Sequence, residues 1–263
     1  MSAHKTKKRV IIITGASSGI GKSLAKYYSG ADVVLGITGR DKERLDSVAD
    51  TCRGKGAVVV SRVIDVTDRK VMEDWLLGFD DKYPIDMVIA NAGISAGTGG
   101  VLIGEDPEQV RRVFDVNLNG VINTIEPVQS RMLVRKSGQI VLMSSLAGYR
   151  GWPGAPAYCG SKAAVKVYGE SLRGVLKSSG ICVNVVCPGF VRSRITACND
   201  FPMPFLMETD KAAKIIAKGL HKNKGRIVFP FISGIMAWFF MVIPDFMAQF
   251  LLSFSPDKPT EVE

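Results

Sequence analysis

Hydrophobic residues occur along this chain as short continuous runs, separated by longer stretches of helical period. The runs predict strands at Val10–Thr14, Asp32–Thr38, Ala57–Ile64, Met87–Ala90, Gln139–Met143, Ile181–Val186 and Arg226–Phe229. The stretches between them predict helices at Ile20–Tyr28, Lys42–Cys52, Arg69–Phe79, Pro107–Arg135, Ala157–Ser178 and Thr209–Lys222. Unbroken runs of Val, Ile and Leu are typical of strands that are buried on both faces of a parallel sheet.

Strands and helices that alternate in this way predict an α/β fold, a Rossmann-type doubly wound parallel sheet with helices on both faces. The sequence contains no repeat and no linker-like stretch. We therefore expect a single domain over residues 1–263, with a basic tail at 1–9 and an apolar C-terminal extension at 227–254. Ligands of such folds bind beyond the C-terminal ends of the strands, so residues just after the strands are the functional candidates.

A glycine-rich loop follows the first predicted strand and leads directly into a helix. It reads Thr14-Gly15-Ala16-Ser17-Ser18-Gly19-Ile20-Gly21. Glycine permits a tight turn and a close approach of the backbone to phosphate, and the helix N-terminus offers free N–H groups. The spacing GxxxGxG differs from the GxGxxG dinucleotide fingerprint. A tight turn without a ligand is the alternative, but the position after the first strand favours a pyrophosphate site.

This loop resembles the TGxxxGxG pattern with which the short-chain dehydrogenase/reductase family opens. Three further signatures of that family follow in order: Asn91-Ala92-Gly93, a Ser/Tyr/Lys set, and Pro188-Gly189. The resemblance continues to about Ser193 and covers most of the chain. It implies an oxidoreductase that moves a hydride between a nicotinamide and a carbonyl or alcohol carbon of a small molecule.

The residues after the second predicted strand bear on the choice of cofactor. An NAD-specific site usually has an acidic residue here that binds the ribose 2′-hydroxyl. This chain has Gly39 instead, followed by Arg40, whose guanidinium can hold a 2′-phosphate in bidentate fashion. We therefore predict NADP(H). Asp41 can partly neutralise Arg40, and Ser18 stands where relatives that use NADP often have a basic residue.

By resemblance, other residues after the strands also contact the dinucleotide. Asp65, followed by Val66, is implied to bind the adenine amino group. The alternative for Asp65 is a helix N-cap, a role for which Thr67 or Asp68 is better placed.

Two further family signatures follow later strands. In the first, Ala92 and Gly93 leave room for the ribose, and Asn91 is implied to tie neighbouring strands together. The second, Pro188-Gly189-Phe190-Val191, is implied to lie against the nicotinamide, with the Val191 backbone at the carboxamide. Ser193 stands where the family often has threonine, and the hydroxyl is kept.

Tyr158 and Lys162 are four residues apart, so they share one face of a predicted helix. A phenol has a pKa near ~10, but a nearby ammonium and the positive nicotinamide ring would lower it toward the range of an efficient acid–base catalyst. By resemblance the catalytic serine lies thirteen residues before the tyrosine, which selects Ser145; its hydroxyl would stabilise charge on the substrate oxygen. Ser144 is then a structural neighbour that satisfies a backbone group.

Asn117 matches the fourth catalytic position of the family. In relatives this residue distorts a helix and holds a water that links the lysine to solvent. A satisfied buried amide is the alternative, and the sequence does not separate the two.

Beyond Ser193 the likeness to the family fades, and the chain becomes apolar. Ile227–Phe254 contains a single charge, Asp245, and prolines interrupt it. A membrane span needs about 20 apolar residues without such breaks, so none is expected. Upstream, lysines recur at helical spacing at Lys211, Lys214, Lys218 and Lys222.

Two interpretations of this extension remain. It either lies in a membrane interface, with the lysines on anionic lipid, or it forms a hydrophobic substrate pocket and a subunit interface. We place the second first, since it is the simpler for this family, and we expect a homodimer or homotetramer. Both indicate an apolar carbonyl substrate of lipid-, steroid- or retinoid-like character.

The net charge of +9 suits anionic partners. Part of it lies in the tail, at Lys5, Lys7, Lys8 and Arg9, but no recognition motif accompanies it and we expect no nucleic-acid partner. The five cysteines lack metal-ligand spacing, so no metal is expected. No apolar run precedes the first strand, which indicates a cytoplasmic protein, with membrane association under the first interpretation above.

The alternative to an enzyme is a non-catalytic NADP-binding sensor or scaffold on the same fold. The intact set of Ser145, Tyr158 and Lys162 argues against it, because a sensor needs only the nucleotide loop. A methyltransferase on a similar sheet would have no use for the Tyr/Lys pair.

Overall fold

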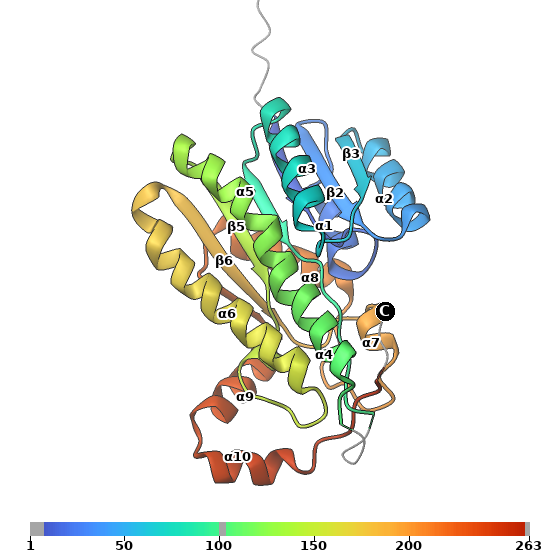
Figure 1. Cartoon of the computed structure of the whole chain (residues 1–263), viewed down its shortest axis with the longest axis vertical. Helices are drawn as coiled ribbons and strands as arrows, with labels where there is room; N and C mark the ends of the chain where they lie inside the picture. The colour runs from blue at the N-terminus through green and yellow to red at the C-terminus, as the bar shows by residue number, and fades with distance from the viewer. Residues whose placement is uncertain (1–7, 100–103, 261–263) are drawn as a thin grey trace, which may run out of the picture.

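The computed structural model describes residues 8–99 and 104–260, so residues 1–7 of the predicted basic tail lie outside it. A sheet of seven parallel strands forms the centre, in the order β3-β2-β1-β4-β5-β6-β7 (Figure 1). The strands are β1 (Arg9–Ile13), β2 (Val33–Gly39), β3 (Val58–Val63), β4 (Met87–Ala90), β5 (Gly138–Met143), β6 (Ile181–Pro188) and β7 (Arg226–Phe229). The predicted strands and the doubly wound parallel fold are confirmed, with only small shifts at the strand ends.

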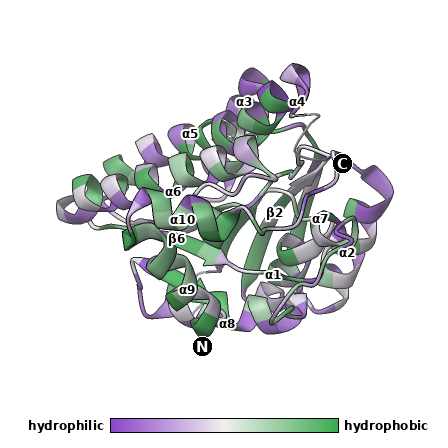
Figure 2. Cartoon of the chain, turned by 90° about the horizontal axis from the view of Figure 1, so that it is seen from below, coloured by the Kyte–Doolittle hydropathy of each residue, from purple (hydrophilic) through white to green (hydrophobic). Residues whose placement is uncertain are grey.

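Helices cover both faces of the sheet, as Figure 2 shows. One face carries α1 (Gly19–Tyr28), α2 (Lys42–Gly54) and α8 (Thr209–His221). The other carries α3 (Arg69–Lys82), α5 (Gly120–Arg135) and α6 (Pro156–Leu176). Successive side chains of β1 enter opposite cores: Ile12 packs under α3 and α5, and Ile13 under α1 and α2. Two cores explain why the central strands β1 and β4 are apolar at nearly every position.

The order of the strands reverses beside β1, which lies between β2 and β4. The connections that follow β1 and β4 leave the sheet toward opposite faces, so a crevice opens between them at the C-terminal ends of the strands. This is where the glycine-rich loop and the Asn91-Ala92-Gly93 signature lie, since each follows one of these two strands.

The helix predicted over Pro107–Arg135 is not continuous. It consists of α4 (Pro107–Phe114), a π-helical turn η1 (Asp115–Asn119) and α5. Short 3-10 turns, η2 (Leu146–Gly148) and η3 (Lys177–Ser179), lie on either side of α6.

Three helices lie where none was predicted: α7 (Arg194–Ala197), α9 (Phe231–Val242) and α10 (Asp245–Leu252). Helices α9 and α10 are apolar nearly all round, so no polar face gives them a helical period. Pro230 and Pro244 directly precede them, at a position that a proline tolerates because the first N–H groups of a helix have no partner inside it.

Candidate active site

A cavity of about 630 Å³ opens at the C-terminal ends of the strands. Most residues singled out in the sequence line it: Gly15, Ser17, Ser18, Gly19, Ile20, Gly39, Arg40, Asp65, Val66, Asn91, Ala92, Gly93, Ser145, Tyr158, Lys162, Pro188, Gly189, Val191 and Ser193. Two of them, Gly21 and Asn117, lie behind its wall. Motifs far apart in the sequence therefore meet at one place.

The glycine-rich loop is packed too tightly for side chains. Gly15 has a φ of +64°, and a Cβ there would lie 2.8 Å from the Ala92 Cα. A Cβ on Gly21 would lie 2.3 Å from the Gly15 carbonyl oxygen. The Asn91 Nδ2 donates to the carbonyl oxygens of Thr14 (2.9 Å) and Gly15 (3.2 Å), which confirms that this amide ties β4 to β1. The bare backbone at the start of α1 forms a cradle that fits a pyrophosphate.

Next to this loop, two arginines line the cavity at the start of α2. Arg40 is exposed, and Arg44, which the sequence analysis missed, follows one helical turn later. The Asp41 carboxylate caps α2 by accepting from the Arg44 N–H at 2.9 Å, and it also pairs with the Arg44 Nη2 at 2.8 Å. The Arg44 Nε is buried and has no hydrogen-bond partner within the described residues. Asp41 thus pairs with Arg44, and this corner of the cavity holds two guanidinium groups.

The structure settles which of Asp65 and Asp68 caps the following helix. The Asp68 carboxylate is the N-cap of α3, accepting from the Val71 N–H at 3.1 Å, as its position indicated. Asp65 instead accepts from the N–H (3.0 Å) and the hydroxyl (2.8 Å) of Thr67, and it lines the cavity. Asp65 therefore does not cap α3, and its adenine-binding role stays a prediction.

The catalytic candidates come together where β5 ends and α6 begins. The Lys162 Nζ donates to the Met143 carbonyl oxygen at 3.1 Å and lies 5.9 Å from the centre of the Tyr158 ring. The Ser145 hydroxyl accepts from the Ala147 N–H at 3.1 Å and is hydrogen-bonded to Tyr158. Ser144 donates to the Lys162 carbonyl oxygen at 2.7 Å, which confirms its structural role.

The expected fall in the pKa of Tyr158 is not found in the protein itself. Burial raises the pKa of Tyr158 to about 12, and the hydrogen bond with Ser145 only partly offsets this. Burial also lowers the pKa of Lys162 to about 8. The sequence argument counted the charge of the ammonium but not the loss of water around both groups, which disfavours the charged form of each.

Asn117 lies inside the π-helical turn η1 and is fully buried. Its Oδ1 accepts from the Ile94 N–H at 2.9 Å, and its Nδ2 donates to the Ile94 carbonyl oxygen and to the Ser161 hydroxyl, both at 3.0 Å. The side chain is thus a satisfied buried amide in a distorted helix. Its predicted link to Lys162 through a water stays a prediction.

The turn after β6 closes the cavity on the other side. The Gly189 N–H donates to the Phe229 carbonyl oxygen at 2.7 Å, and Val191 forms a parallel bridge with Met207. Ser193 directly precedes α7, and its Cβ is 3.3 Å from where a Cβ on Gly19 would lie. The turn therefore stands against the glycine-rich loop.

The remaining wall comes from parts of the chain that carry no family signature. It is mostly apolar and is formed by Trp152, Phe201, Phe205, Met236, Ala237 and Phe240, next to Phe190 of the turn after β6. One charged residue from the end of the chain, Lys258, joins it. No local pattern in the sequence singled it out.

The sheet, the glycine cradle and the Ser/Tyr/Lys set define a nucleotide-dependent oxidoreductase of the Rossmann type. The family model for short chain dehydrogenase matches residues 9–200, and the chain belongs to this family. An uncharacterized oxidoreductase of Myxococcus xanthus (strain DK1622) is 37% identical over 223 residues, which cover 84% of this chain and 87% of that protein.

Solved structures agree. A short-chain dehydrogenase from Sphingobium yanoikuyae in complex with NADPH has a TM-score of 0.78 at 27% identity, covering 94% of this chain and 96% of that one. A 3-oxoacyl-[acyl-carrier protein] reductase from Brucella melitensis with bound NAD has a TM-score of 0.72 at 27% identity, covering 85% and 90%. The protein is an enzyme that acts on a CH–OH or C=O group.

Among the helices of residues 8–99 and 104–260, none is both long and apolar enough to cross a membrane. Over the same ranges, no three His, Cys, Asp or Glu side chains gather in a way that could hold a metal ion.

Proposed function

We propose that this enzyme interconverts a carbonyl and a secondary alcohol on an apolar substrate with NADP(H), using Tyr158 as general acid and base. The observation that carries the proposal is the convergence of Ser145, Tyr158 and Lys162 with the glycine-rich loop on one cavity. A sensor or scaffold would need the loop alone.

The preference for NADP(H) over NAD(H) rests on the charge at the start of α2. A carboxylate at position 39 would repel a 2′-phosphate, but Gly39 has no side chain. There is also no room for one, since a Cβ there would lie 2.9 Å from the Ser17 hydroxyl. Arg40 and Arg44 supply the cations, and the unpartnered Arg44 Nε offers a donor. Asp65 is proposed to bind the adenine.

In the reduction, the substrate oxygen lies between the hydroxyls of Ser145 and Tyr158. When bound, the nicotinamide supplies the hydride to the carbonyl carbon. With its pKa at about 12, the phenol is protonated near neutral pH, which is the form that reduction requires. Tyr158 gives this proton to the substrate oxygen, so that no full charge builds up there. The Lys162 ammonium then stabilises the phenolate.

The test is Tyr158→Phe, assayed by NADPH oxidation over a panel of apolar ketones. We expect turnover to fall at least about a hundredfold, because general acid catalysis contributes roughly that much, while NADPH affinity is unchanged. Tyr168→Phe, on the same helix but outside the cavity wall, is the matched control and should behave as wild type. Full activity in Tyr158→Phe would sink the assignment.

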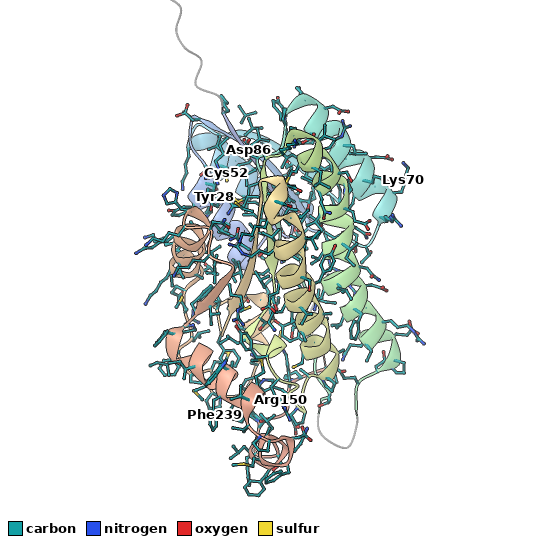
Figure 3. All side chains as sticks on the ribbon, turned by 90° about the vertical axis from the view of Figure 1, so that its left-hand side faces the viewer. Tyr28, Cys52, Lys70, Asp86, Arg150 and Phe239 are labelled. Carbon is teal, nitrogen blue, oxygen red and sulfur yellow. The ribbon has the colours of Figure 1, made fainter. Side chains whose placement is uncertain are left out.

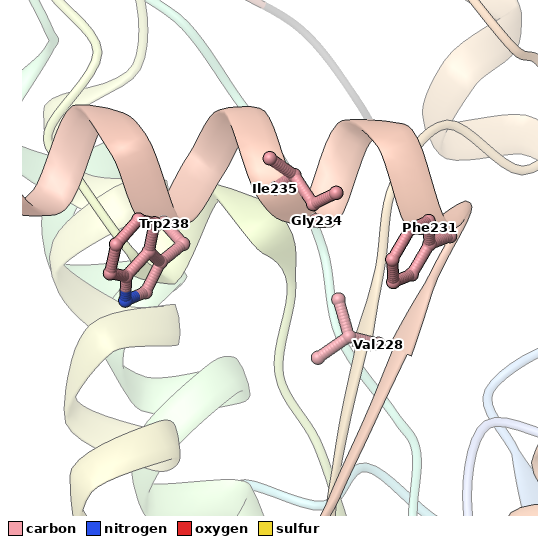
Figure 4. A pocket seen from close by; sticks show the side chains of 5 residues that line it. All are labelled: Val228, Phe231, Gly234, Ile235 and Trp238. Atoms are coloured by element: carbon pink, nitrogen blue, oxygen red, sulfur yellow. The ribbon is translucent and has the colours of Figure 1, made fainter.

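The apolar character of the substrate rests on α9, whose inner side chains Met236, Ala237 and Phe240 line the cavity. Its outer side is equally apolar: Phe231 is 78% exposed, and Trp238 and others are about half exposed. Figure 4 shows a shallow pocket of about 200 Å³ on this side, formed by Val228, Phe231, Gly234, Ile235 and Trp238. A substrate pocket alone does not account for the exposed side.

Helix α10 extends the same surface with Phe246, Phe250 and the following Phe254, each at least 65% exposed. Asp245, the one charge, forms an ion pair with Arg150 near Phe239 (Figure 3). Exposed apolar surfaces of this kind mark contact with a membrane or another protein. We propose that the α9–α10 surface lies on a membrane, because it adjoins the cavity that an apolar substrate must enter from lipid.

The membrane proposal is tested by sedimentation with anionic and neutral vesicles, alongside light scattering. We expect Phe246→Ser and Phe250→Ser together to reduce vesicle binding without changing NADPH affinity. If the wild type does not bind vesicles and forms a dimer that the two substitutions dissociate, the surface is a subunit interface. We propose the cytoplasm as the compartment, since all five cysteines are free thiols.

A further inference from the structure

After α10 the chain returns from the lower end of the molecule to the cavity (Figure 1). We call residues 255–260 the C-terminal strap. The Gly99 N–H donates to the Lys258 carbonyl oxygen at 2.9 Å, and a Cβ on Gly97 would lie 2.4 Å from that oxygen. On the other side, a Cβ on Gly154 would lie 3.2 Å from the Lys258 nitrogen. The strap thus passes between two glycine positions that leave room only for its backbone.

This path places the Lys258 side chain beside the catalytic tyrosine. The Lys258 Nζ lies 4.9 Å from the centre of the Tyr158 ring, nearer than the Nζ of Lys162 at 5.9 Å. It donates a hydrogen bond to the hydroxyl of Ser95, which is fully buried. Lys258 also lines the cavity.

No carboxylate of the described residues forms an ion pair with Lys258. The groups that face it are the Ser95 hydroxyl, the Tyr158 ring and the thiols of Cys159 and Cys198. Burial lowers the pKa of Lys258 to about 8. Lys258 is half-buried, and an ammonium in such a place without a counter-charge is less favourable than in water unless an anion joins it.

The two lysines have different surroundings. The Lys162 Nζ bonds the end of β5 and lies 3.1 Å from where a Cβ on Gly93 would be, among the residues of the dinucleotide side. Lys258 comes from the strap, whose Ser255 and Pro256 line the cavity together with the apolar residues of α9. Lys258 is therefore on the substrate side of Tyr158.

We propose that Lys258 binds a carboxylate of the substrate, so that the enzyme acts on amphipathic oxo acids with the carboxylate close to the carbonyl. This rests on the proposed function. The oxygen to be protonated lies at Tyr158, the ammonium meets the carboxylate next to it, and the hydrocarbon part lies along Met236 and Phe240. Lys258 then selects substrates with a carboxylate, and the apolar residues of the wall contact the hydrocarbon chain of the substrate.

The first test is binding, which needs no turnover. Calorimetry measures octanoate and its neutral counterpart octanamide on protein saturated with the dinucleotide it binds. We expect wild type to prefer octanoate at least about tenfold, as a charge-assisted hydrogen bond would give. Lys258→Met should abolish the preference and Lys258→Arg keep most of it, with Lys222→Met, an exposed lysine outside the cavity, as control. An equal preference in wild type and Lys258→Met overturns the proposal.

The second test separates selection from catalysis. With α-oxooctanoate and α-oxooctanamide as substrates, Lys258→Met should raise KM for the acid about tenfold and leave kcat for the amide unchanged. A loss of kcat for both, with a shifted pH profile, would instead make Lys258 a positioning group for Tyr158 and overturn the proposal. If neither compound is reduced by an enzyme that reduces other apolar ketones, the oxo-acid proposal is overturned. If no ketone of the panel is reduced while the dinucleotide binds, the proposed function fails, and the calorimetry still decides the role of Lys258.

Discussion

Replacing Arg44 by glutamine tests the proposed preference of this enzyme for NADPH over NADH. The variant keeps a helix propensity close to that of arginine but removes the guanidinium group and its charge. A charge-assisted hydrogen bond contributes about 1.5–3 kcal/mol, or roughly ten- to hundredfold in affinity. In wild type the Arg44 Nη2 is already paired with Asp41 at 2.8 Å, and the two side chains are 41% and 37% exposed. Because Arg44 is shared with Asp41 and screened by water, its contribution to NADPH affinity should be at the lower end of this range, about tenfold.

The assay is a pair of fluorescence titrations, with NADPH and with NADH. Arg44→Gln should weaken NADPH about tenfold and leave NADH unchanged, because only NADPH carries the 2′-phosphate. Arg53→Gln is the matched control, since Arg53 lies on the same helix and its partner Asp50 is outside the cavity wall. An equal loss for both dinucleotides would refute the reasoning, as that outcome means a damaged α2.

Asp41→Asn provides the opposite perturbation. Asparagine still caps α2, but it no longer neutralises Arg44, so NADPH should bind a few times more tightly while NADH is unaffected. Tighter binding of both NADPH and NADH would mean that the substitution acts through the conformation of α2 and not through the charge of Arg44.

Three further predictions concern the protein's stability and the cradle. Gly15→Ala should abolish dinucleotide binding in the same titrations, because its φ is +64° and the new Cβ would lie 2.8 Å from the Ala92 Cα. Arg135→Met should lower the free energy of unfolding in urea by about 3 kcal/mol, since it leaves the buried Asp80 carboxylate without the partner it holds at 2.6 and 2.9 Å. The pKa of Lys162 falls from 10.5 to about 8 on folding, so the unfolded chain binds more protons than the folded one between these pH values. The free energy of unfolding of wild type, relative to Lys162→Met, should therefore rise by about 3 kcal/mol as pH rises from about 8 to 10.5. A difference that does not change with pH would contradict the burial of Lys162.

Patterns within a few residues carried the fold and much of the site. The strands are continuous apolar runs because two cores press on them, and such runs are visible in the sequence. The cavity residues follow those strands directly, as in the loop after β1. Helices α9 and α10 were missed for the opposite reason: each has apolar residues on both its buried and its exposed side, so neither shows a helical period.

The missed site residues depend on geometry that no local pattern contains. Asp41 caps α2 and so fixes where this helix begins. The position of Arg44 along the helix then places its side chain at the cavity. Lys258 reaches Tyr158 from a hundred residues away in the chain, along a path set by Gly97 and Gly154. The pKa of Tyr158 depends on burial, which the spacing of Tyr158 and Lys162 does not reveal.

The cavity has guanidinium groups at one end, the Lys162 ammonium in its middle and the Lys258 ammonium on the substrate side. Under the proposed function, the first two of these positions lie along the bound dinucleotide. There the Lys162 ammonium bonds a carbonyl oxygen of the protein, and the Arg44 guanidinium pairs with a carboxylate. Lys258 is held by a neutral hydroxyl alone. Under the proposed function, the other cations stabilise a phosphate or the phenolate, and the Lys258 ammonium has neither role. This is why we propose a substrate anion as its partner, and the apolar side chains of α9 that line the cavity favour an anion with a hydrocarbon chain.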